Sequence, residues 1–599
     1  MKKQIIILLS LILTAAALSG CSIKVRELNP TKDDTYVNTA EYTETLTDGI
    51  DSLGRTLTKG SKKTPLRDKT VGIFYFLWLG EHGSSGPYDN SIISQVEGAL
   101  DSEEGWIAAG GSKQGVMHFW GKPMFDYYTS QDKWVMRKHV QMLTDAGVDF
   151  VCFDVTNGYT YTENALKLME ILHEYKLQGW DVPGVVFYTN SHSADVMTQL
   201  YNDIYLAHPE YEDVWFNWDG KPMIVGDSDD ITLASEVKEF FTIKENQWPT
   251  EDKKDNGLPW MEFGRLLTDS AIYGVDGRKE VVNVSVAQHS QTCTMSLTAW
   301  YGFNDRSRNW HDGANDTSED ALLYGYNFAE QFEWALDIDP EMIFITGWNE
   351  WTAQRQSPGT APIIFVDNAN AECSRDIEPM EGGYGDNYYM QMISYIRQFK
   401  GTLPYAEATG QVIDIEGGFA QWNDVETYYK DYVGDTAARN NVRGWGTNKL
   451  SDFSGRNDIS EMKVCEDNDN VYFFVKCADT ITEPEGNTWM NLFISTDNSK
   501  GWCGYNYVLN YKTADRDGYM YLGKLETGDD YNVTDLCEVR ARVYNDMLMV
   551  EIPKKALSIR GNAKFYFKWA DNCTEGDVFG FYKTGDAAPI GRAGYCYGY

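Results

Sequence analysis

Several signatures of well-known enzyme classes are missing from this sequence. The chain has no HExxH pair for zinc, no GxxxxGK[ST] loop for nucleotide phosphates and no GxSxG turn for an esterase serine. No CxxC spacing occurs among its 10 cysteines, and its 8 histidines are dispersed. These absences argue against a zinc protease, a P-loop nucleotidase and a serine esterase, and we expect neither a bound metal nor a cofactor.

Positive charge is also scarce. The 599 residues include 52 Lys and Arg against 89 Asp and Glu, a net charge of −37. A nucleic-acid partner is therefore not expected, because a phosphate backbone requires a basic surface. Aromatic residues, in contrast, reach 14%, with 19 Trp and 38 Tyr. Flat rings that stack on sugar faces are one familiar use of such a content.

Long apolar runs are rare, and the clearest lies at the start of the chain. Lys2 and Lys3 precede an apolar stretch over residues 5–18. That length suits a signal-peptide core and falls short of the roughly 20 residues that a membrane-spanning helix needs. The run ends in Leu18-Ser19-Gly20-Cys21, which resembles the bacterial lipobox.

This resemblance implies a lipoprotein signal peptide over residues 1–21. The mature chain would begin at Cys21, with acyl chains such as palmitate anchoring it to a membrane. An ordinary secretory signal followed by a chance cysteine is the alternative. We expect an exported, membrane-anchored lipoprotein on the bacterial cell surface, with residues 22–66 as a tether rich in Thr, Asp, Lys and Gly.

Short apolar runs alternate with amphipathic stretches from residue 67 to residue 403. The helical pattern over Trp134–Ala146 ends at Gly147, directly before an apolar run, and Asn387–Phe399 would be the closing helix. Alternation of this kind predicts parallel strands, and eight units predict a (β/α)8 barrel of the TIM type, with a doubly wound sheet as the alternative. The expected strands are residues 71–79, 148–155, 184–190, 222–226, 259–263, 281–287, 342–348 and 362–366.

Helical periodicity largely disappears after residue 403. Over residues 411–599 the pattern consists of short β-type runs bounded by Asp, Asn and Gly, which predicts an all-β sandwich. Six of the cysteines fall here, and an exported domain could pair them as disulfides. The expected strands are residues 462–464, 471–476, 489–494, 505–511, 519–522, 547–552 and 563–569.

The main candidate for chemistry is Glu350. The apolar run over residues 342–348 ends in Gly-Trp and then presents Asn349, Glu350 and Trp351. A carboxyl group beside an indole and partly shielded from water has a raised pKa, which keeps a general acid protonated near neutral pH. Asn349 could bind a sugar hydroxyl or orient Glu350, although a strand-end Glu can also simply cap the next helix.

Cleavage of a glycosidic bond generally needs a second carboxylate. Asp154 directly follows the apolar run Phe150–Phe153, where an ionised group is costly unless it faces a lined cavity. Glu262 ends the fifth expected strand, and Asp126 lies in an aromatic run. We favour Asp154, whose alternative role is a helix cap or a loop-locking hydrogen bond.

Other aromatic and polar residues at expected strand ends would form the walls of a binding site. Each of them alone could equally be part of the core, and only their collective placement suggests contact with a ligand. The residues are Tyr75, Trp78, His118, Trp120, Asn157, Tyr188, Asn190, His289 and Trp310.

Residues 70–400 resemble the barrels of glycoside hydrolase families 99 and 71. The resemblance rests on Asn349-Glu350-Trp351 and on the stretches 118–128, 150–158 and 374–389. In family 99 the Glu of this motif assists the sugar 2-hydroxyl, and a Glu three residues later is the acid/base. Here that position is Ala353, so another carboxylate must supply the role or the barrel binds glycan without cutting it.

Residues 411–599 resemble the family 9 carbohydrate-binding modules. The likeness lies in Trp422, residues 489–497 and residues 501–507. It implies Trp489, Trp502 and Tyr505 as rings that stack on glycan, although such modules also use Trp in the sandwich core.

Together these features predict a cell-surface glycoside hydrolase that is endo-acting on a polysaccharide, with Glu350 as the main carboxylate and Asp154 or Glu262 as its partner. The alternatives are a noncatalytic glycan-binding lipoprotein, which Ala353 favours, and a transglycosylase or envelope-glycan factor.

Overall fold

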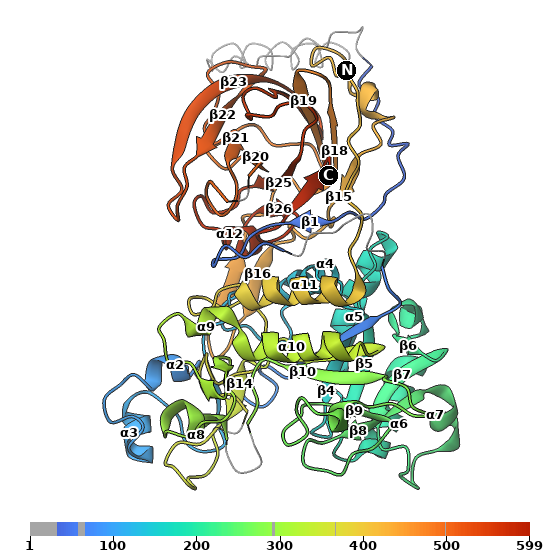
Figure 1. Ribbon diagram of the computed structural model, residues 1–599, viewed down its shortest axis with the longest axis vertical. Coiled ribbons are helices and arrows are strands. Elements are labelled where there is room, and N and C mark those ends of the chain that lie inside the picture. Colours follow the sequence, from blue (N-terminus) through green and yellow to red (C-terminus); the bar gives the residue numbers. More distant parts are fainter. Residues whose placement is uncertain (1–32, 58–65, 290–293, 366, 498) are drawn as a thin grey trace, which may run out of the picture.

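The computed structural model describes residues 33–57, 66–289, 294–365, 367–497 and 499–599. Figure 1 shows a barrel of strands and helices below and a body made of β-strands above it. The expected fold class, a (β/α)8 barrel followed by an all-β domain, is confirmed. The predicted lipidation site Cys21 lies outside the described residues.

Eight parallel strands form the barrel, in the sheet order β10-β13-β2-β4-β5-β7-β8-β9. Read from β2, this is the order of the chain, with the first and last strands paired through β2 and β13. The ring is nearly closed, since no ladder joins β9 to β10. The strands are β2 (Thr70–Tyr75), β4 (Phe150–Val155), β5 (Gly184–Thr189), β7 (Lys221–Gly226), β8 (Thr242–Gln247), β9 (Gly257–Pro259), β10 (Val281–Ser285) and β13 (Met342–Thr346).

The barrel differs from the expected strands at two places. Strand β8 was missed because its sequence TIKENQ is polar, yet Lys244 is buried with its Nζ 2.7 Å from Glu280 Oε1. The run 362–366 is not an eighth strand: Ile363, Ile364 and Phe365 are buried in a loop. Apolar residues therefore mark burial here and not strand pairing.

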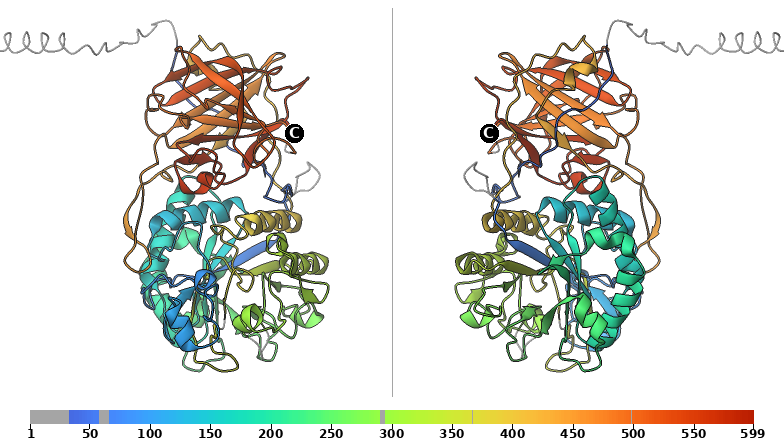
Figure 2. Two further views of the ribbon diagram at one scale, coloured as in Figure 1. Left: turned by 90° about the vertical axis from the view of Figure 1, so that its left-hand side faces the viewer. Right: turned by 90° about the vertical axis from the view of Figure 1, so that its right-hand side faces the viewer.

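Helices cover the outside of the barrel strands (Figure 2). Asp132 caps the first turn of α4 by accepting from the Trp134 N–H at 3.1 Å. The expected helices at 134–146 and 387–399 are confirmed. The longer helices are α4 (Lys133–Asp145), α5 (Thr162–Leu177), α6 (Ser193–Leu200), α10 (Tyr326–Ile338) and α11 (Asn387–Lys400).

Short elements decorate the barrel. They are α2 (Asn90–Ile93), α3 (Glu103–Ala108), α7 (Ser235–Phe240), α8 (Met295–Trp300), α9 (Ala321–Tyr324), β3 (Met117–Phe119), β6 (Asn217–Trp218), β11 (Trp310–His311), β12 (Ala314–Asn315) and β14 (Thr352–Gln354).

The β domain, defined here as β1, β15 and the strands from β18 onward, is one antiparallel sheet. Its hydrogen bonds follow the order β1-β27-β25-β20-β21-β22-β23-β24-β19-β18-β15, and β26 pairs with β25. The strands are β1 (Thr47–Asp48), β15 (Tyr428–Lys430), β18 (Ile459–Glu466), β19 (Asn470–Cys477), β20 (Asn491–Ser495), β21 (Tyr507–Leu509), β22 (Tyr519–Leu525), β23 (Val533–Tyr544), β24 (Met547–Pro553), β25 (Phe565–Asp571), β26 (Asp586–Ala588) and β27 (Gly594–Tyr597).

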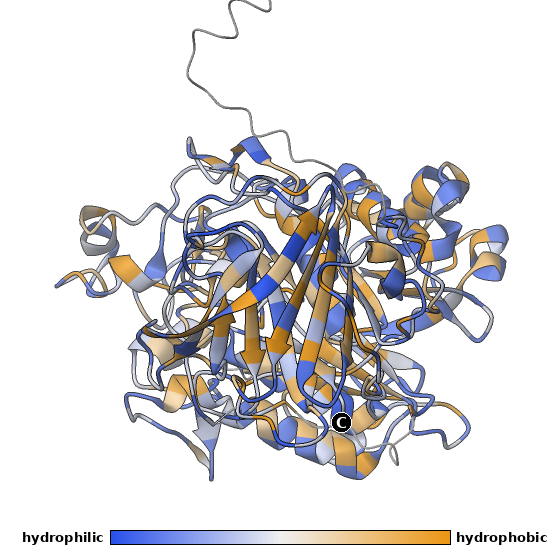
Figure 3. Ribbon diagram, turned by 90° about the horizontal axis from the view of Figure 1, so that it is seen from above, coloured by the Kyte–Doolittle hydropathy of each residue, from blue (hydrophilic) through white to orange (hydrophobic). Residues whose placement is uncertain are grey.

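The sheet bends around its own apolar core. Val464, Phe473, Leu492, Val550 and Phe567 come from strands far apart in the sheet order and belong to one buried cluster. Figure 3 shows hydrophobic runs along these strands, interrupted by hydrophilic positions. The two halves of the bent sheet thus pack against each other through the same inner face, as the two sheets of a sandwich do.

Part of the expected tether is packed onto the protein. Leu46 and Leu57 are 1% and 2% exposed, and β1 pairs with β27 at Thr47 and Asp48. The prediction that residues 22–66 form an unpacked linker is therefore wrong for residues 33–57. The structural reason is that the edge strand β27 gains a hydrogen-bonded neighbour.

A hairpin of β16 (Arg439–Arg443) and β17 (Lys449–Asp452) reaches from the β domain along one side of the barrel (Figure 2). Arg439 Nη2 lies 2.6 Å from Asp132 Oδ2, and the rings of Trp445 and Phe119 are 5.0 Å apart. The two domains are therefore joined at more than one place.

The structure also bears on membrane-spanning helices and on disulfides. Among the described residues, no helix combines the length and the apolar character needed to span a bilayer. The thiols of Cys465, Cys477, Cys503, Cys537 and Cys573 are free, so the disulfides that the sequence permitted do not join these five cysteines.

Candidate active site

Carboxyl groups gather at the carboxyl ends of the barrel strands. Asp154 lies at the end of β4, and Glu350 follows β13 by four residues. Asp367 and Arg375 belong to the loop between β14 and α11. Parallel strands of a barrel end on one face, and this is the face on which barrel enzymes carry their active sites.

Glu350 is held by two side chains. Its Oε2 accepts from Arg375 Nη2 at 2.9 Å and from Asn368 Nδ2 at 3.0 Å. The residue is 7% exposed. Burial raises the pKa of Glu350 well above its usual value, against the opposing effect of Arg375. A raised pKa favours the protonated form, which is the form that a proton donor needs.

Asp367 shares the same guanidinium but differs in its state. Its Oδ1 lies 3.1 Å from Arg375 Nη2 and 3.9 Å from His289 Nε2, and its side chain is 35% exposed. Burial opposes ionisation of Asp367, but Arg375 and His289 outweigh it and hold its pKa below the usual value. One Arg375 nitrogen thus contacts two carboxyl groups whose pKa values are shifted in opposite directions.

Asp154 is the second predicted carboxylate that the structure places in this group. Its Oδ2 accepts from Trp78 Nε1 and its Oδ1 from the Thr156 N–H, both at 2.9 Å. Burial raises the pKa of Asp154, and these hydrogen bonds partly offset the rise. Asp154 also contributes to the raised pKa of Glu350, so the two groups interact electrostatically.

Asp376 orients the main chain at Glu350. Its Oδ1 accepts from the Glu350 N–H at 2.6 Å, while its Oδ2 is buried and has no hydrogen-bond partner among the described residues. Burial raises the pKa of Asp376 to about 6. A group that fixes the backbone of Glu350 fixes the direction of its side chain as well.

An open cleft of about 650 Å³ lies beyond the carboxyl ends of β8, β9 and β10 and meets the carboxyl groups around Glu350 through His289. Its lining includes His289, which faces Asp367, together with Phe263, Arg265 and Arg306. The Arg306 guanidinium lies 5.0 Å over the ring of Trp310, which is half-buried and does not itself line the cleft. The cleft has room for a sugar-sized ligand.

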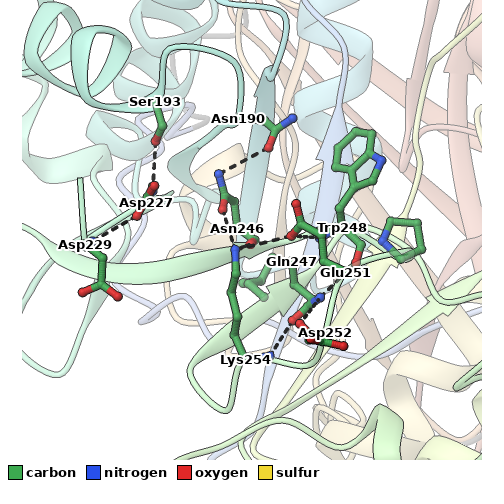
Figure 4. Close-up of polar contacts among 12 residues, drawn as sticks. Asn190, Ser193, Asp227, Asp229, Asn246, Gln247, Trp248, Glu251, Asp252 and Lys254 are labelled. Carbon is green, nitrogen blue, oxygen red and sulfur yellow. Dashed lines mark hydrogen bonds and ion pairs between the residues drawn. The ribbon is translucent and has the colours of Figure 1, made fainter. Parts of the chain in front are cut away.

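A polar network covers the ends of β5, β7 and β8 (Figure 4). Asn246 Nδ2 donates to the Thr189 carbonyl at 3.1 Å and to Asn190 Oδ1 at 3.4 Å. Lys254 Nζ donates to Asn246 Oδ1 at 3.1 Å. Asn190, which the sequence predicted, is therefore placed at this face with half of its surface buried.

Several predicted wall residues do not reach the site, and these predictions are corrected. Asn349 holds the backbone of Phe76, and the Trp120 and Trp351 rings stack on each other at 4.2 Å with no exposed face. A fully covered ring or amide cannot touch a sugar. The buried residues of this kind are Tyr75, His118, Trp120, Tyr188, Asn349 and Trp351.

His118 illustrates the reason. Its Nε2 accepts from the Ser112 N–H at 3.1 Å, and it packs in a small apolar cluster with Trp106 and Phe365. Burial lowers the pKa of His118 to about 4, so the ring is neutral. Polar residues at strand ends can therefore have all their hydrogen bonds inside the core. Tyr188, for example, donates its hydroxyl to the Leu258 carbonyl at 2.8 Å.

Glu262 and Asp126 are engaged locally. Glu262 accepts from Tyr273 Oη and from Arg265 Nε at 2.9 Å, which occupies both of its oxygens. Asp126 Oδ1 accepts from the Tyr127 N–H at 2.7 Å. Neither contacts Glu350 among the described residues, whereas Asp154 acts electrostatically on Glu350. Asn157 is exposed beyond the end of β4.

Ala353 lies away from the cleft. It is 5% exposed on β14, pairs with His118 of β3 and packs into the same apolar cluster as Trp106. A carboxylate at this position would be buried among apolar groups. The missing second Glu is therefore replaced, if at all, from another part of the chain.

The aromatic residues predicted to bind glycan in the β domain are buried, which corrects that prediction. Trp489, Trp502 and Tyr505 are 1%, 2% and 0% exposed. Trp489 Nε1 donates to the Thr482 carbonyl at 2.9 Å, and Tyr505 Oη to the Arg592 carbonyl at 3.0 Å. These rings form core, and no face is left for a sugar.

Sequence reasoning missed Asp367, Asn368, Arg375 and Asp376. They lie in a loop after the run that was taken for an eighth strand. The available clue was the density of charged and amide residues between residues 367 and 378, a polar stretch inside the length assigned to the barrel.

No protein-family model matches this chain, and no curated protein matches it. Among solved structures, two structures of the family 99 endo-α-mannosidase from Bacteroides thetaiotaomicron match with TM-scores of 0.28, at 14% and 15% identity, covering 56% of this chain and 98% of theirs. A glycoside hydrolase-like protein matches with a TM-score of 0.26 at 12% identity, covering 57% of this chain and 98% of its own. Similarity at this level assigns no activity, which must be argued from the site itself.

Proposed function

We propose that the barrel is a glycoside hydrolase and that Glu350 is its proton donor. The carrying observation is that Arg375 Nη2 lies 2.9 Å from Glu350 and 3.1 Å from Asp367, two carboxyl groups that differ in burial. Pairs of carboxyl groups whose surroundings push their pKa values apart are the usual basis of acid and base roles in glycosidases.

In the proposed reaction Glu350 protonates the oxygen of the scissile glycosidic bond as that bond breaks. In one route Asp367 takes a proton from a water molecule whose oxygen bonds to the anomeric carbon as the leaving oxygen departs, so Asp367 ends protonated and Glu350 ionised. In the other route Asp367 itself bonds to the anomeric carbon, and a water molecule deprotonated by Glu350 then displaces it; both routes give the hemiacetal product. Asp154 supports the protonated state of Glu350 by electrostatic repulsion. His289 and Arg375 keep Asp367 ionised.

The substrate class and location belong to the same proposal. The cleft lies at the strand ends and is open, which suits an internal segment of a polysaccharide and hence endo-action. The signal-like start of the chain and Cys21 support export and lipid anchoring at the bacterial surface. The half-buried ring of Phe263 in its lining supports contact with sugar.

Noncatalytic glycan binding is the second candidate. It is favoured by the tight packing of Glu350, which is 7% exposed and bonded to both Asn368 and Arg375. If the barrel only binds glycan, the role of Glu350 and Asp367 is to hold the loop after β14 in place.

The test compares the chain from residue 22 onward with its Glu350→Gln variant on a panel of polysaccharides, measuring new reducing ends. We expect release by the parent and a loss of about 10³-fold in the variant, as for removal of a general acid. Glu381→Gln is the matched control, because Glu381 is exposed and pairs with Lys122 at the surface. Equal release by parent and Glu350→Gln would refute the role of Glu350, and binding without release would support the capture function.

A further inference from the structure

Buried aspartates gather where the β domain meets helix α4 of the barrel. Asp431, Asp435 and Asp586 each offer a carboxylate oxygen, and these oxygens all lie within 4.8 Å of one another. Asp431 and Asp435 follow β15, and Asp586 begins β26. Each residue is at most 3% exposed. Bulk water therefore cannot screen their charges from one another.

Each carboxylate is positioned through one oxygen and leaves the other bare. Gln141 Nε2 donates to Asp435 Oδ2 at 2.9 Å, and the Ile459 N–H donates to Asp586 Oδ2 at 2.6 Å. Asp431 Oδ2, Asp435 Oδ1 and Asp586 Oδ1 are buried without a hydrogen-bond partner among the described residues. Buried acceptors are nearly always satisfied, so three bare oxygens in one group indicate a missing ligand.

The charges around this group do not balance. Asp458 is a fourth carboxylate: its Oδ2 accepts from the Gly434 N–H at 2.8 Å, and its Oδ1 is also bare. The ammonium groups that act on these aspartates are those of Lys138 and Lys568. The carboxyl groups outnumber these ammonium groups, so a bound divalent cation would supply positive charge and favour the ionised carboxylates.

We propose that Asp431, Asp435 and Asp586 bind a divalent cation of the calcium class, with Asp458 beside them. All the donors are carboxylate oxygens, which calcium prefers and zinc does not. Oxygens about 2.3–2.6 Å from a shared calcium ion can be separated by the distances found here. The site goes beyond the proposed hydrolase function and does not involve Glu350.

The position of the site gives it a structural role. Lys138 and Gln141 belong to α4 of the barrel, and both contact Asp435 of the β domain, at 3.4 and 2.9 Å. Figure 1 shows α4 at the side of the barrel nearest to the β domain. A cation bound to Asp435 and Asp586 would therefore stabilise the junction between the two domains.

The first test uses the chain from residue 22 onward, which keeps every described residue. After treatment with a chelator it is titrated with calcium chloride in a calorimeter, and thermal unfolding is followed with and without calcium. We expect one calcium ion per chain and a rise in Tm of about 5 to 10 °C at a hundredfold excess over Kd. The absence of saturable binding by the parent would overturn the proposal.

Two variants locate the bound ion. In Asp586→Asn the amide oxygen still accepts from the Ile459 N–H, while the amide nitrogen replaces the bare oxygen. We expect a loss of at least tenfold in calcium affinity, and in chelator a Tm no lower than that of the parent, because repulsion is reduced. If Asp586→Asn does not fold, Asp435→Asn is measured in its place, and the same loss of calcium affinity is expected.

Asp497→Asn is the control, because Asp497 is exposed and pairs with Lys500 at 2.9 Å. It should bind calcium like the parent. Calcium binding that is unchanged in both cluster variants would place the ion elsewhere and overturn the assignment.

Discussion

Two of the acids around Glu350 share a buried guanidinium, whereas each of the three acids around Asp586 keeps an unpaired oxygen among the described residues. Arg375 contacts both Glu350 and Asp367, and its ring-stacking partner Trp260 lies 5.0 Å away. At the domain junction Asp431, Asp435 and Asp586 outnumber the lysines that reach them. The first group is neutralised by the chain itself, and the second requires something from solution. A buried guanidinium is therefore compatible with carboxyl groups that gain and lose protons. A group of unpaired carboxylate oxygens is compatible with binding a cation.

The strongest way to separate the two groups is Glu350→Gln. Hydrolysis should fall by about 10³-fold, since the amide cannot donate the proton. The calcium-dependent rise in Tm should stay as in the parent, because Asp586 and its neighbours are unchanged. Reducing-end assays and thermal unfolding of the same preparation check both parts. If the mutation abolished the calcium response, the two groups would not be independent.

Arg375→Met tests whether the guanidinium neutralises the first group. Removing it leaves Glu350 and Asp367 without their counter-ion, and we expect a loss of about 3 kcal/mol in the free energy of unfolding, measured by urea denaturation. Arg278→Met is the matched control, because Arg278 pairs with Glu341 near the surface. The control should cost less than about 1 kcal/mol. Similar losses in both would show that the pairing of Arg375 is not special.

Asp376→Asn is expected to stabilise the protein at high pH. Burial raises the pKa of Asp376 to about 6, above that of the unfolded chain. Between pH 4 and pH 6 the folded protein therefore holds a proton that the unfolded chain has lost, and stability falls as pH rises. The variant lacks this loss, so it should be more stable than the parent by about 3 kcal/mol at pH 8 and equal to it near pH 4. Urea denaturation at pH 4 and at pH 8 measures the two stability differences. A variant that is more stable than the parent at pH 4 would contradict the raised pKa of Asp376 as the cause.

Trp78→Phe should have the smallest effect. It removes the hydrogen bond to Asp154 Oδ2, which lowers the pKa of Asp154. The pKa of Asp154 should rise, and kcat/KM should fall at the acidic end of its pH profile by an amount equivalent to about 1 kcal/mol. Tyr159→Phe, an exposed ring nearby, is the control. A profile that is unchanged in Trp78→Phe would place Asp154 outside the reaction.

The sequence was a good guide to the barrel wherever burial was continuous. Seven of the expected strands are present, because parallel strands covered on both faces appear as uninterrupted apolar runs. Strand β8 escaped because Lys244 and Asn246 are paired inside the structure, which no pattern of hydropathy reveals. The apolar run at 362–366 was wrongly predicted to be a strand, because apolar residues in a loop can also be buried.

The candidate site was predictable only in part. A carboxyl group after an apolar strand pointed to Glu350 and Asp154, and both lie at the strand ends. Arg375 and Asp367 could not be inferred, because a loop brings them to Glu350 from 25 and 17 positions farther along the chain. The stacking rings of the β domain were misjudged because a Trp in a β-run looks the same whether it faces a sugar or the core.

Composition and local pattern, by themselves, determined the acidic character of the chain, its division into a barrel and a β domain, and the position of Glu350. These properties depend on neighbours in the chain, so they can be read along it. Tertiary structure alone decided which charges meet: Arg375 between two carboxyl groups, and Asp431, Asp435 and Asp586 around bare oxygens. The reason is physical, since the pKa of a buried acid and its affinity for a cation depend on groups that lie close in space and far apart in sequence.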